Sequence, residues 1–348
     1  MPDREDVRDL MRGLPLRRAP EGMWQSIEAA LRRPAKPVPF IRRPMSSPLL
    51  AAAALLVALL GGAYIGVLRS YGAPSRWDVM PLAGTPTVAG AALLDHGGLS
   101  VGEWLVTDDE SRAELTVGRI GVADVGPNSR VRLDRGGLTD HRLTLERGSL
   151  SAVIAAPPRL FFVRTPAALA TDLGCAYTLE VDSAGTSRIH VTAGWVELRQ
   201  GSRISLVPAG LVAEVGIGRG PGTPYPDGFP AEARAALHRL DRGTGTDRDL
   251  ALVFAALHTA EDYVTLRRES GITLWHLLQR LDGAMRERVY RRLAELAPPP
   301  AGVTREGILA LQRPMLESWR RDLNPMWSEE AETWLARAAR QLWNWTVR

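Results

Sequence analysis

The sequence predicts a multidomain membrane protein with a single transmembrane α-helix, an all-β domain and a small C-terminal α-helical bundle. Three observations predict this arrangement. Residues 48–68 form an uncharged apolar run, short alternating runs separated by turn residues occupy 80–225, and the apolar period becomes helical over 228–348. The 348 residues suffice for two compact domains besides the membrane span.

The apolar run has the length of a membrane span. No charged side chain occurs from Pro44 to Leu68. The 21 residues of 48–68 would form a helix of roughly 31 Å, which matches a hydrocarbon core of about 30 Å. A signal peptide would have a shorter apolar region with a small-residue cleavage site, and a soluble core helix would keep a polar face. We therefore expect a transmembrane helix, with the lipid bilayer as a partner.

Basic residues on either side of the span predict its direction. Within 20 residues, five precede the span and two follow it: Arg32, Arg33, Lys36, Arg42 and Arg43, then Arg69 and Arg76. The positive-inside bias therefore predicts a cytoplasmic N-terminus, with residues 69–348 outside. In a bacterium this is a single-pass protein of the inner (cytoplasmic) membrane whose larger part is periplasmic or extracellular.

Residues 1–47 predict a cytoplasmic tail with short amphipathic helices. They are too few for a conventional core, and two stretches show helical spacing of apolar residues. In the second stretch, Met23, Trp24, Ile27 and Leu31 would share one helix face. This face is a candidate surface for a partner protein. Alternatively, it lies on the inner leaflet beside the basic residues, and the sequence leaves both interpretations open.

The region 80–225 predicts short strands separated by turns. Gly, Asn, Asp and Ser punctuate the runs, as is typical of an all-β domain that is either a sandwich or a stacked, solenoid-like sheet. We expect a break at Glu146–Ser149 and a linker at Gly216–Gly222. The predicted strands are Arg112–Val117, Arg130–Leu133, Arg142–Leu145, Leu160–Val163, Tyr177–Val181, Arg188–Val191, Val196–Leu198 and Ile204–Val207.

These blocks resemble a known family. The succession GEWLVTDDESRAELTVGRIGVADVGPNSRVRL, LTLERGSLSAVI, FFVRTPAALATDLGCAYTLEVD and IHVTAGWVEL is similar to the FecR domain of bacterial membrane-bound sensors and sigma-factor regulators. The resemblance covers about residues 95–215, with Glu146–Leu150, Val163–Thr178 and Ile189–Leu198 in the places of the family's motifs. The chain departs from the pattern at Gly126–Ser129, where a DGS or DGT turn is common, and at Cys175, where Thr is usual.

The resemblance implies a signalling role. An extracytoplasmic domain would sense a state, and the cytoplasmic tail would regulate an extracytoplasmic-function sigma factor in the manner of an anti-sigma factor. The expected partners are that sigma factor and an unidentified periplasmic protein or ligand. The alternative is a non-enzymatic envelope scaffold that binds protein or polysaccharide and has no sigma partner.

The region 228–348 predicts a bundle of about six short helices. The apolar side chains recur at helical spacing in successive stripes, and Asp282 is a candidate N-cap. Six tryptophans occur here, and we interpret them as core or seam residues rather than a binding face: Trp275, Trp319, Trp327, Trp334, Trp343 and Trp345. The stripes are Phe229, Ala233, Leu237, Leu240; Leu250, Val253, Phe254, Leu257; Met285, Val289, Leu293, Leu296; Met315, Leu316, Trp319, Leu323; and Trp334, Leu335, Ala338, Ala339, Leu342.

The sequence contains no catalytic, cofactor or metal motif that we recognise, so we expect neither an enzyme nor a cofactor. None of the six histidines has a metal-ligand spacing. His276 is interpreted as a buried helix residue, and His258 beside Glu261 and Asp262 as a surface pair. Cys175, the one cysteine, is expected in mid-strand as an inert buried thiol. No basic face with interleaved aromatics is present, so no direct contact with nucleic acid is expected.

Overall fold

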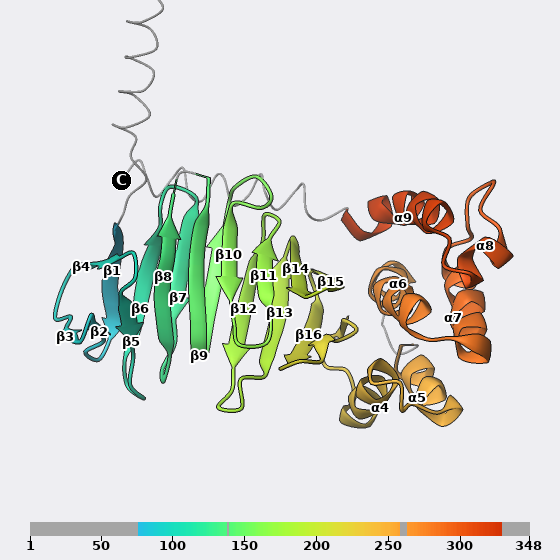
Figure 1. Cartoon of the computed structure of the whole chain (residues 1–348), viewed down its shortest axis with the longest axis horizontal. Coiled ribbons are helices and arrows are strands. Elements are labelled where there is room, and N and C mark those ends of the chain that lie inside the picture. The colour runs from blue at the N-terminus through green and yellow to red at the C-terminus, as the bar shows by residue number, and fades with distance from the viewer. Residues whose placement is uncertain (1–75, 138, 258–262, 329–348) are drawn as a thin grey trace, which may run out of the picture. The chain divides into compact units, whose positions relative to one another are not determined.

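The computed structural model describes residues 76–137, 139–257 and 263–328 (Figure 1). They all belong to the second of the two units into which the chain divides, Val67–Arg348. This part of the chain is a β-domain followed by helices, as the sequence predicts. The predicted tail and the predicted span 48–68 lie outside the described residues. Among the helices that are described, none combines the length and the apolar character needed to cross a bilayer.

Eighteen strands make up the β-domain within the described residues. They are β1 (Arg76–Ala83), β2 (Thr87–Val88), β3 (Ala91–Ala92), β4 (Gly97–Ser100), β5 (Trp104–Val106), β6 (Arg112–Val117), β7 (Gly121–Val125), β8 (Arg130–Gly136), β9 (His141–Ile154), β10 (Phe161–Arg164), β11 (Leu169–Asp172), β12 (Ala176–Val181), β13 (Ser187–Ala193), β14 (Trp195–Gln200), β15 (Arg203–Pro208), β16 (Leu211–Gly216), β17 (Gly220–Pro221) and β18 (Tyr225–Pro226).

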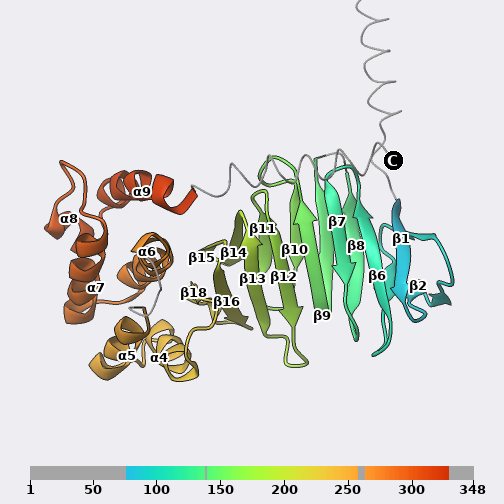
Figure 2. The same cartoon turned by 180° about the vertical axis from the view of Figure 1, so that it is seen from behind.

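Two sheets share the long strand β9. The first sheet contains β4, β1, β6, β7, the C-terminal half of β9, β12, β13 and β16. The second contains β3, β2, β5, β8, the N-terminal half of β9, β10, β11, β14 and β15. Figures 1 and 2 both place β9 in the middle of the strand succession.

The change of sheet within β9 occurs at Gly148. Arg147 still pairs with Arg130 of the second sheet, whereas Gly148 pairs with Val181 of the first. Gly148 has φ +90°, and a Cβ there would collide with the backbone and hydroxyl of Ser129. Only glycine adopts this φ without strain and leaves room for Ser129. The expected break at Glu146–Ser149 is therefore wrong, because the glycine bends a continuous strand instead of ending it.

The two sheets pack face to face around one core. Buried and partly exposed residues alternate along strands such as β6 and β8, and the buried ones from both sheets form a single cluster. Trp77 of the first sheet lies 5.8 Å from His141 of the second, between ring centroids. The hairpin β10–β11 belongs to the second sheet, β12–β13 to the first and β14–β15 to the second. The domain thus combines sandwich packing with a solenoid-like progression of strands.

The predicted strands agree closely with the observed ones, and three details need correction. The predicted linker Gly216–Gly222 contains part of a hairpin, because Val215 and Gly216 of β16 pair with Pro221 and Gly220 of β17. Cys175 does not lie in mid-strand but directly before β12, in the turn that follows β11. The third correction is that strand β9 continues through Gly148. Ten of the described strands are additional to those predicted: β1, β2, β3, β4, β5, β7, β11, β16, β17 and β18.

Six helices follow the sheets within the described residues. They bury most of the predicted apolar stripes, including Ala233, Leu237 and Leu240 in the first helix. Asp282 holds the N-cap position of the fourth helix, as predicted, although its side chain makes no capping hydrogen bond. The helices are α4 (Ala231–Asp241), α5 (Asp247–Leu257), α6 (Tyr263–Arg280), α7 (Gly283–Leu296), α8 (Arg305–Leu309) and α9 (Arg313–Ser328).

Candidate functional site

The candidate site begins where helix α6 meets β15, the last strand of the second sheet. One edge of β15 pairs with β14, and the other edge would leave backbone groups unpaired. His276 of α6 lies against that edge, with its Nε2 atom 3.3 Å from both the nitrogen and the oxygen of Leu206. Thr273 of α6 donates to the Pro224 carbonyl at 2.8 Å. The helical region is therefore joined to the sheet by buried hydrogen bonds.

Asp241, the last residue of α4, is the centre of a polar network beside this contact. Its Oδ1 atom accepts hydrogen bonds from Arg203 at 3.0 Å, Arg280 at 2.9 Å and the Thr223 hydroxyl at 2.7 Å. Its Oδ2 atom accepts from the Thr223 backbone nitrogen at 2.7 Å. A carboxylate at a helix C-terminus is unfavourable by itself, because the helix dipole is negative there. The two arginines compensate, and Arg203 also donates to the Asp241 carbonyl.

Arg280 brings a positive charge into a largely buried position. Its side chain is only 11% exposed, and it donates to Ser205 at 2.6 Å as well as to Asp241 and Thr223. Desolvation lowers the pKa of this guanidinium, Asp241 raises it, and the neighbouring charge of Arg203 lowers it again. One carboxylate is thus shared between two arginines that repel each other.

Burial, together with the same positive charges, determines the protonation state of His276. Burial lowers the pKa of His276 well below its usual value, and the charges of Arg280, Arg320 and Arg203 lower it further. The imidazole is therefore neutral at physiological pH. Three guanidinium groups, one from β15, one from α6 and one from α9, line the same cavity as this ring.

A cavity of about 630 Å³ opens between β15, α6 and α9. Four arginines and two carboxylates line it, so its charge is positive: Arg159, Arg203, Arg280, Arg320, Glu197 and Asp241. Arg159 is paired with Glu197 at 3.0 Å. Ile272, Trp275 and Trp327 contribute apolar wall. Such a combination of apolar surface with a few convergent polar groups is typical of small-molecule sites.

The tryptophans of this wall are held by an aromatic cluster. Trp275 lies 6.1 Å from both Trp319 and Trp327, and Trp319 lies 5.7 Å from Tyr290, between ring centroids. The three tryptophans are between 0% and 6% exposed. For these three, the interpretation as core residues is confirmed, while two of them also form part of the cavity wall. Trp334, Trp343 and Trp345 lie outside the described residues.

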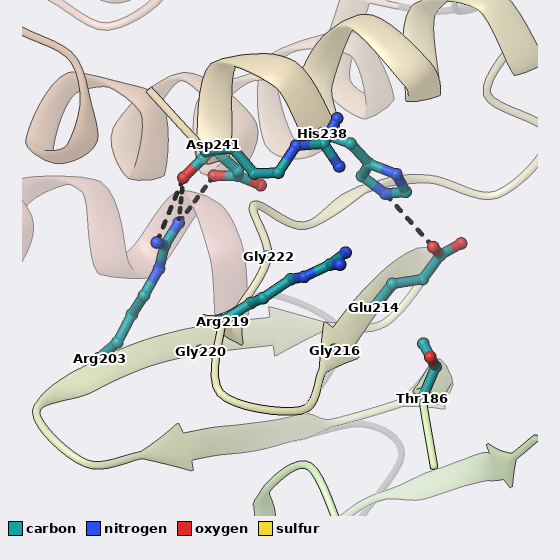
Figure 3. A pocket seen from close by; sticks show the side chains of 10 residues that line it. Thr186, Arg203, Glu214, Gly216, Arg219, Gly220, Gly222, His238 and Asp241 are labelled. Carbon is teal, nitrogen blue, oxygen red and sulfur yellow. Dashed lines mark hydrogen bonds and ion pairs between the residues drawn. The ribbon is translucent and has the colours of Figure 1, made fainter. Parts of the chain in front are cut away.

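A second, smaller cavity of about 140 Å³ also has Arg203 and Asp241 in its wall (Figure 3). The Nε2 atom of His238 in α4 lies 3.3 Å from the Oε2 atom of Glu214 in β16, and Tyr225 donates to Glu214 at 2.6 Å. Figure 3 shows Arg219, from the β16–β17 hairpin, extending into the space between these groups. The hairpin that the sequence analysis interprets as a linker therefore delivers a positive charge to this cavity.

A third polar cluster is enclosed in the β-domain. Asp172, which is 2% exposed, accepts hydrogen bonds from the Gly174 nitrogen and the Cys175 thiol. Desolvation raises the pKa of Asp172 to about 7 in spite of these bonds. Burial and the nearby Asp172 raise the pKa of the Cys175 thiol well above its usual value. Cys175 is thus buried and held as a thiol, in agreement with the sequence analysis.

The arrangement offers charged and apolar groups to a ligand. Within the described ranges, no group of three His, Cys, Asp or Glu side chains could hold a metal ion. The sequence-predicted face of Met23, Trp24, Ile27 and Leu31 lies outside the described residues, as does the group of His258, Glu261 and Asp262. The sequence analysis did not identify the Arg203–Asp241–Arg280 network. Its members are separated by 38 and 39 residues, so no local motif reveals them.

Comparisons with known proteins bear on the β-domain. No curated protein matches the chain. Two crystal structures of a candidate anti-sigma factor from Parabacteroides distasonis align with 39% of this chain and 64% of their own, at 15% identity and a TM-score of 0.32. The alignment thus spans less than two thirds of that protein.

A family model described as FecR protein matches residues 104–197. The match runs from the start of β5 into β14, so it contains the strand β9 that joins the two sheets. Arg203, Asp241 and Arg280 lie beyond the matched residues, where the sheets meet the helices. This match lies within the region that carries the sequence resemblance, so this part of the chain is a FecR domain.

Proposed function

We propose that the chain is a single-pass signalling protein of the bacterial inner membrane that regulates an extracytoplasmic-function sigma factor. Residues 69–348 form the extracytoplasmic sensor, and residues 1–47 form the cytoplasmic tail that engages the sigma factor. The face of Met23, Trp24, Ile27 and Leu31 supplies the contact. The stimulus changes how accessible this face is to the sigma factor.

The observation that carries the proposal is the FecR match over residues 104–197. Two features of the sequence support the remaining parts. The uncharged run 48–68 and the basic residues before it support the topology. The apolar face in a tail without room for a core supports a partner that covers it. The cavities where the sheets meet the helices could receive a ligand of the proposed sensor.

Retention of the sigma factor by the full chain tests the partner. The chain is purified in detergent with the sigma factor encoded nearest to its gene, and co-elution is measured. We expect the unsubstituted chain to retain the sigma factor and the double variant Trp24→Ala/Ile27→Ala to lose it. The double variant Gln25→Ala/Ser26→Ala, off the apolar stripe, is the matched control and should retain it. Equal retention by both double variants would refute the predicted face, and no retention by any chain would refute the partner.

A fusion to alkaline phosphatase tests the topology. The enzyme is joined after residue 75, directly before β1, because an insertion there interrupts no strand. It folds to its active form only outside the cytoplasm, so the proposed orientation predicts an active fusion. An active fusion after residue 40, before the apolar run, would contradict it.

A further inference from the structure

The cavity between β15, α6 and α9 carries more positive charge than its own residues neutralise. Among the described residues, Asp241 is the one carboxylate that contacts Arg203 and Arg280, and its Oδ1 atom already accepts three hydrogen bonds. Arg320 of α9, which also lines the cavity, has no hydrogen-bond or ion-pair partner in the part of the chain that the structure describes. A positive surplus beside a buried arginine is costly unless an anion compensates it.

His276 does not change the positive charge of the cavity. His276 is held neutral by the three arginines and by burial, so it neither adds charge nor accepts it. The other carboxylate of the wall, Glu197, is used by Arg159 at 3.0 Å and by Arg199 at 2.8 Å. Both carboxylates that line the cavity are thus already engaged.

The shape of the cavity indicates what accompanies the anion. A volume of about 630 Å³ is several times that of the neighbouring cavity and exceeds what an inorganic ion needs. Trp275, Trp327 and Ile272 add apolar groups to the charged groups of the wall. Guanidinium groups bind carboxylates and phosphates through paired N–H donors, and tryptophan offers a flat surface to a ring.

We propose that this cavity binds a small organic oxyanion, a carboxylate or phosphate carried on an apolar or ring-shaped body. The oxyanion lies between Arg280 and Arg320, and the body lies against Trp275 and Trp327. Because the cavity lies between the last strand of the second sheet and two helices, a bound ligand holds these elements together. The site does not depend on the identity of any cytoplasmic partner.

Calorimetric titration of the full chain in detergent, without a sigma factor, tests the site. The probe is phenyl phosphate, and benzoate replaces it to distinguish a phosphate from a carboxylate. We expect one of the two to bind and to raise the melting temperature. Inorganic phosphate should bind at least about tenfold more weakly, and phenol should not bind, because each lacks one half of the recognised group. Absence of binding by both ring compounds, or equal binding of inorganic phosphate, would overturn the proposal.

Three variants locate the binding. Arg320→Gln removes an exposed charge without a described partner, so it should leave folding intact and weaken the probe about tenfold. Gln279→Glu places a negative charge on the exposed wall and should abolish binding. Arg321→Gln is the matched control on the same helix, because Arg321 does not line the cavity. Equal losses in Arg320→Gln and Arg321→Gln would refute the site. A negative titration leaves the sigma-factor proposal standing, since the two experiments share no component besides the chain.

Discussion

The Nη1 atom of Arg280 lies 2.9 Å from the Oδ1 atom of Asp241, and the two side chains are 11% and 9% exposed. The pair joins helix α6 to the end of helix α4, while Arg203 brings strand β15 to the same carboxylate. Three elements that are distant in sequence therefore depend on one negative charge. This dependence has a measurable consequence for stability.

Asp241→Asn should destabilise the chain by about 3–5 kcal/mol, because it leaves the largely buried charge of Arg280 without a counter-charge. Urea-induced unfolding followed by tryptophan fluorescence measures the change, since Trp275 lies beside the network. The control is Asp247→Asn, which removes a carboxylate that is 75% exposed and paired with Arg288. Because exposed pairs contribute little, the control should lose less than about 1 kcal/mol. Equal losses would show that the network contributes no more than a surface ion pair.

The raised pKa of Asp172 predicts that the free energy of unfolding falls as the pH rises. Its pKa is raised from 3.8 to about 7 in the folded chain by desolvation. Between these two values the folded chain keeps a proton that the unfolded chain releases, so the stability from this group is lost as pH rises from about 4 to about 7. The loss is of the order of 4 kcal/mol when complete. Asp172→Asn should flatten this part of the curve in urea unfolding at pH 4.5 and pH 8, and an unchanged slope would contradict the assignment.

The sequence is sufficient to predict eight of the eighteen described strands, wholly or in part, because their pattern is local. One face of each sheet is buried, so apolar residues alternate, and strand β6 is predicted to the residue. Gly148 shows where this reasoning fails. A glycine within a polar stretch predicts a turn, whereas its actual role follows from Ser129, which lies close by only after folding.

The cavity could not be predicted for a related reason. In the sequence, the residues on either side of Arg203, Asp241 and Arg280 are those expected around ordinary surface residues of a strand or helix. Their significance comes from the placement of α4 and α6 against β15, which the sequence does not encode in any local period. Trp275 lies in α6, for which no apolar stripe is predicted, and Trp327 lies beyond the predicted stripe that ends at Leu323. In neither case does the local pattern distinguish a core side chain from one that also lines a cavity.

Gly148→Ala should destabilise the β-domain by at least about 2–3 kcal/mol. The added methyl group meets Ser129 while the residue keeps a φ of +90°. Gly201→Ala is the matched control, because it also has positive φ, +57°, but nothing lies within 4 Å of the added carbon. The loss of stability in the control therefore measures only the cost of placing alanine at positive φ, about 1 kcal/mol. Thermal unfolding of both variants by circular dichroism would refute the account of β9 if the two losses were the same.

The start of helix α5 should limit stability in acid. Asp249 accepts from the Thr246 nitrogen at 2.8 Å and from Arg239 at 2.6 Å, and the Asp249 nitrogen donates back to the Thr246 hydroxyl at 3.3 Å, as in a capping box. The hydrogen bond from Arg239 is the main cause that lowers the pKa of Asp249 from 3.8 to about 2. The stabilisation is therefore complete above pH 4 and is lost as pH falls through 2.

Two variants separate the parts of this cap. Thr246→Ala should cost about 1 kcal/mol at neutral pH. Asp249→Asn should remove the acid-dependent part, so its unfolding midpoint should change less than that of the unsubstituted chain between pH 4 and pH 2. A midpoint that falls equally in both chains would show that another carboxylate causes the acid loss.

Sigma-dependent transcription in the organism that encodes the chain tests the central claim, that this FecR-domain protein regulates a sigma factor through its tail. A strain without the gene is complemented with the full chain, with Trp24→Ala/Ile27→Ala or with Gln25→Ala/Ser26→Ala, and a reporter of the adjacent sigma factor is measured at equal protein levels. We predict that the first double variant alters transcription to the level of the deletion strain, while the second matches the unsubstituted chain. Identical reporter levels in all four strains would contradict the account.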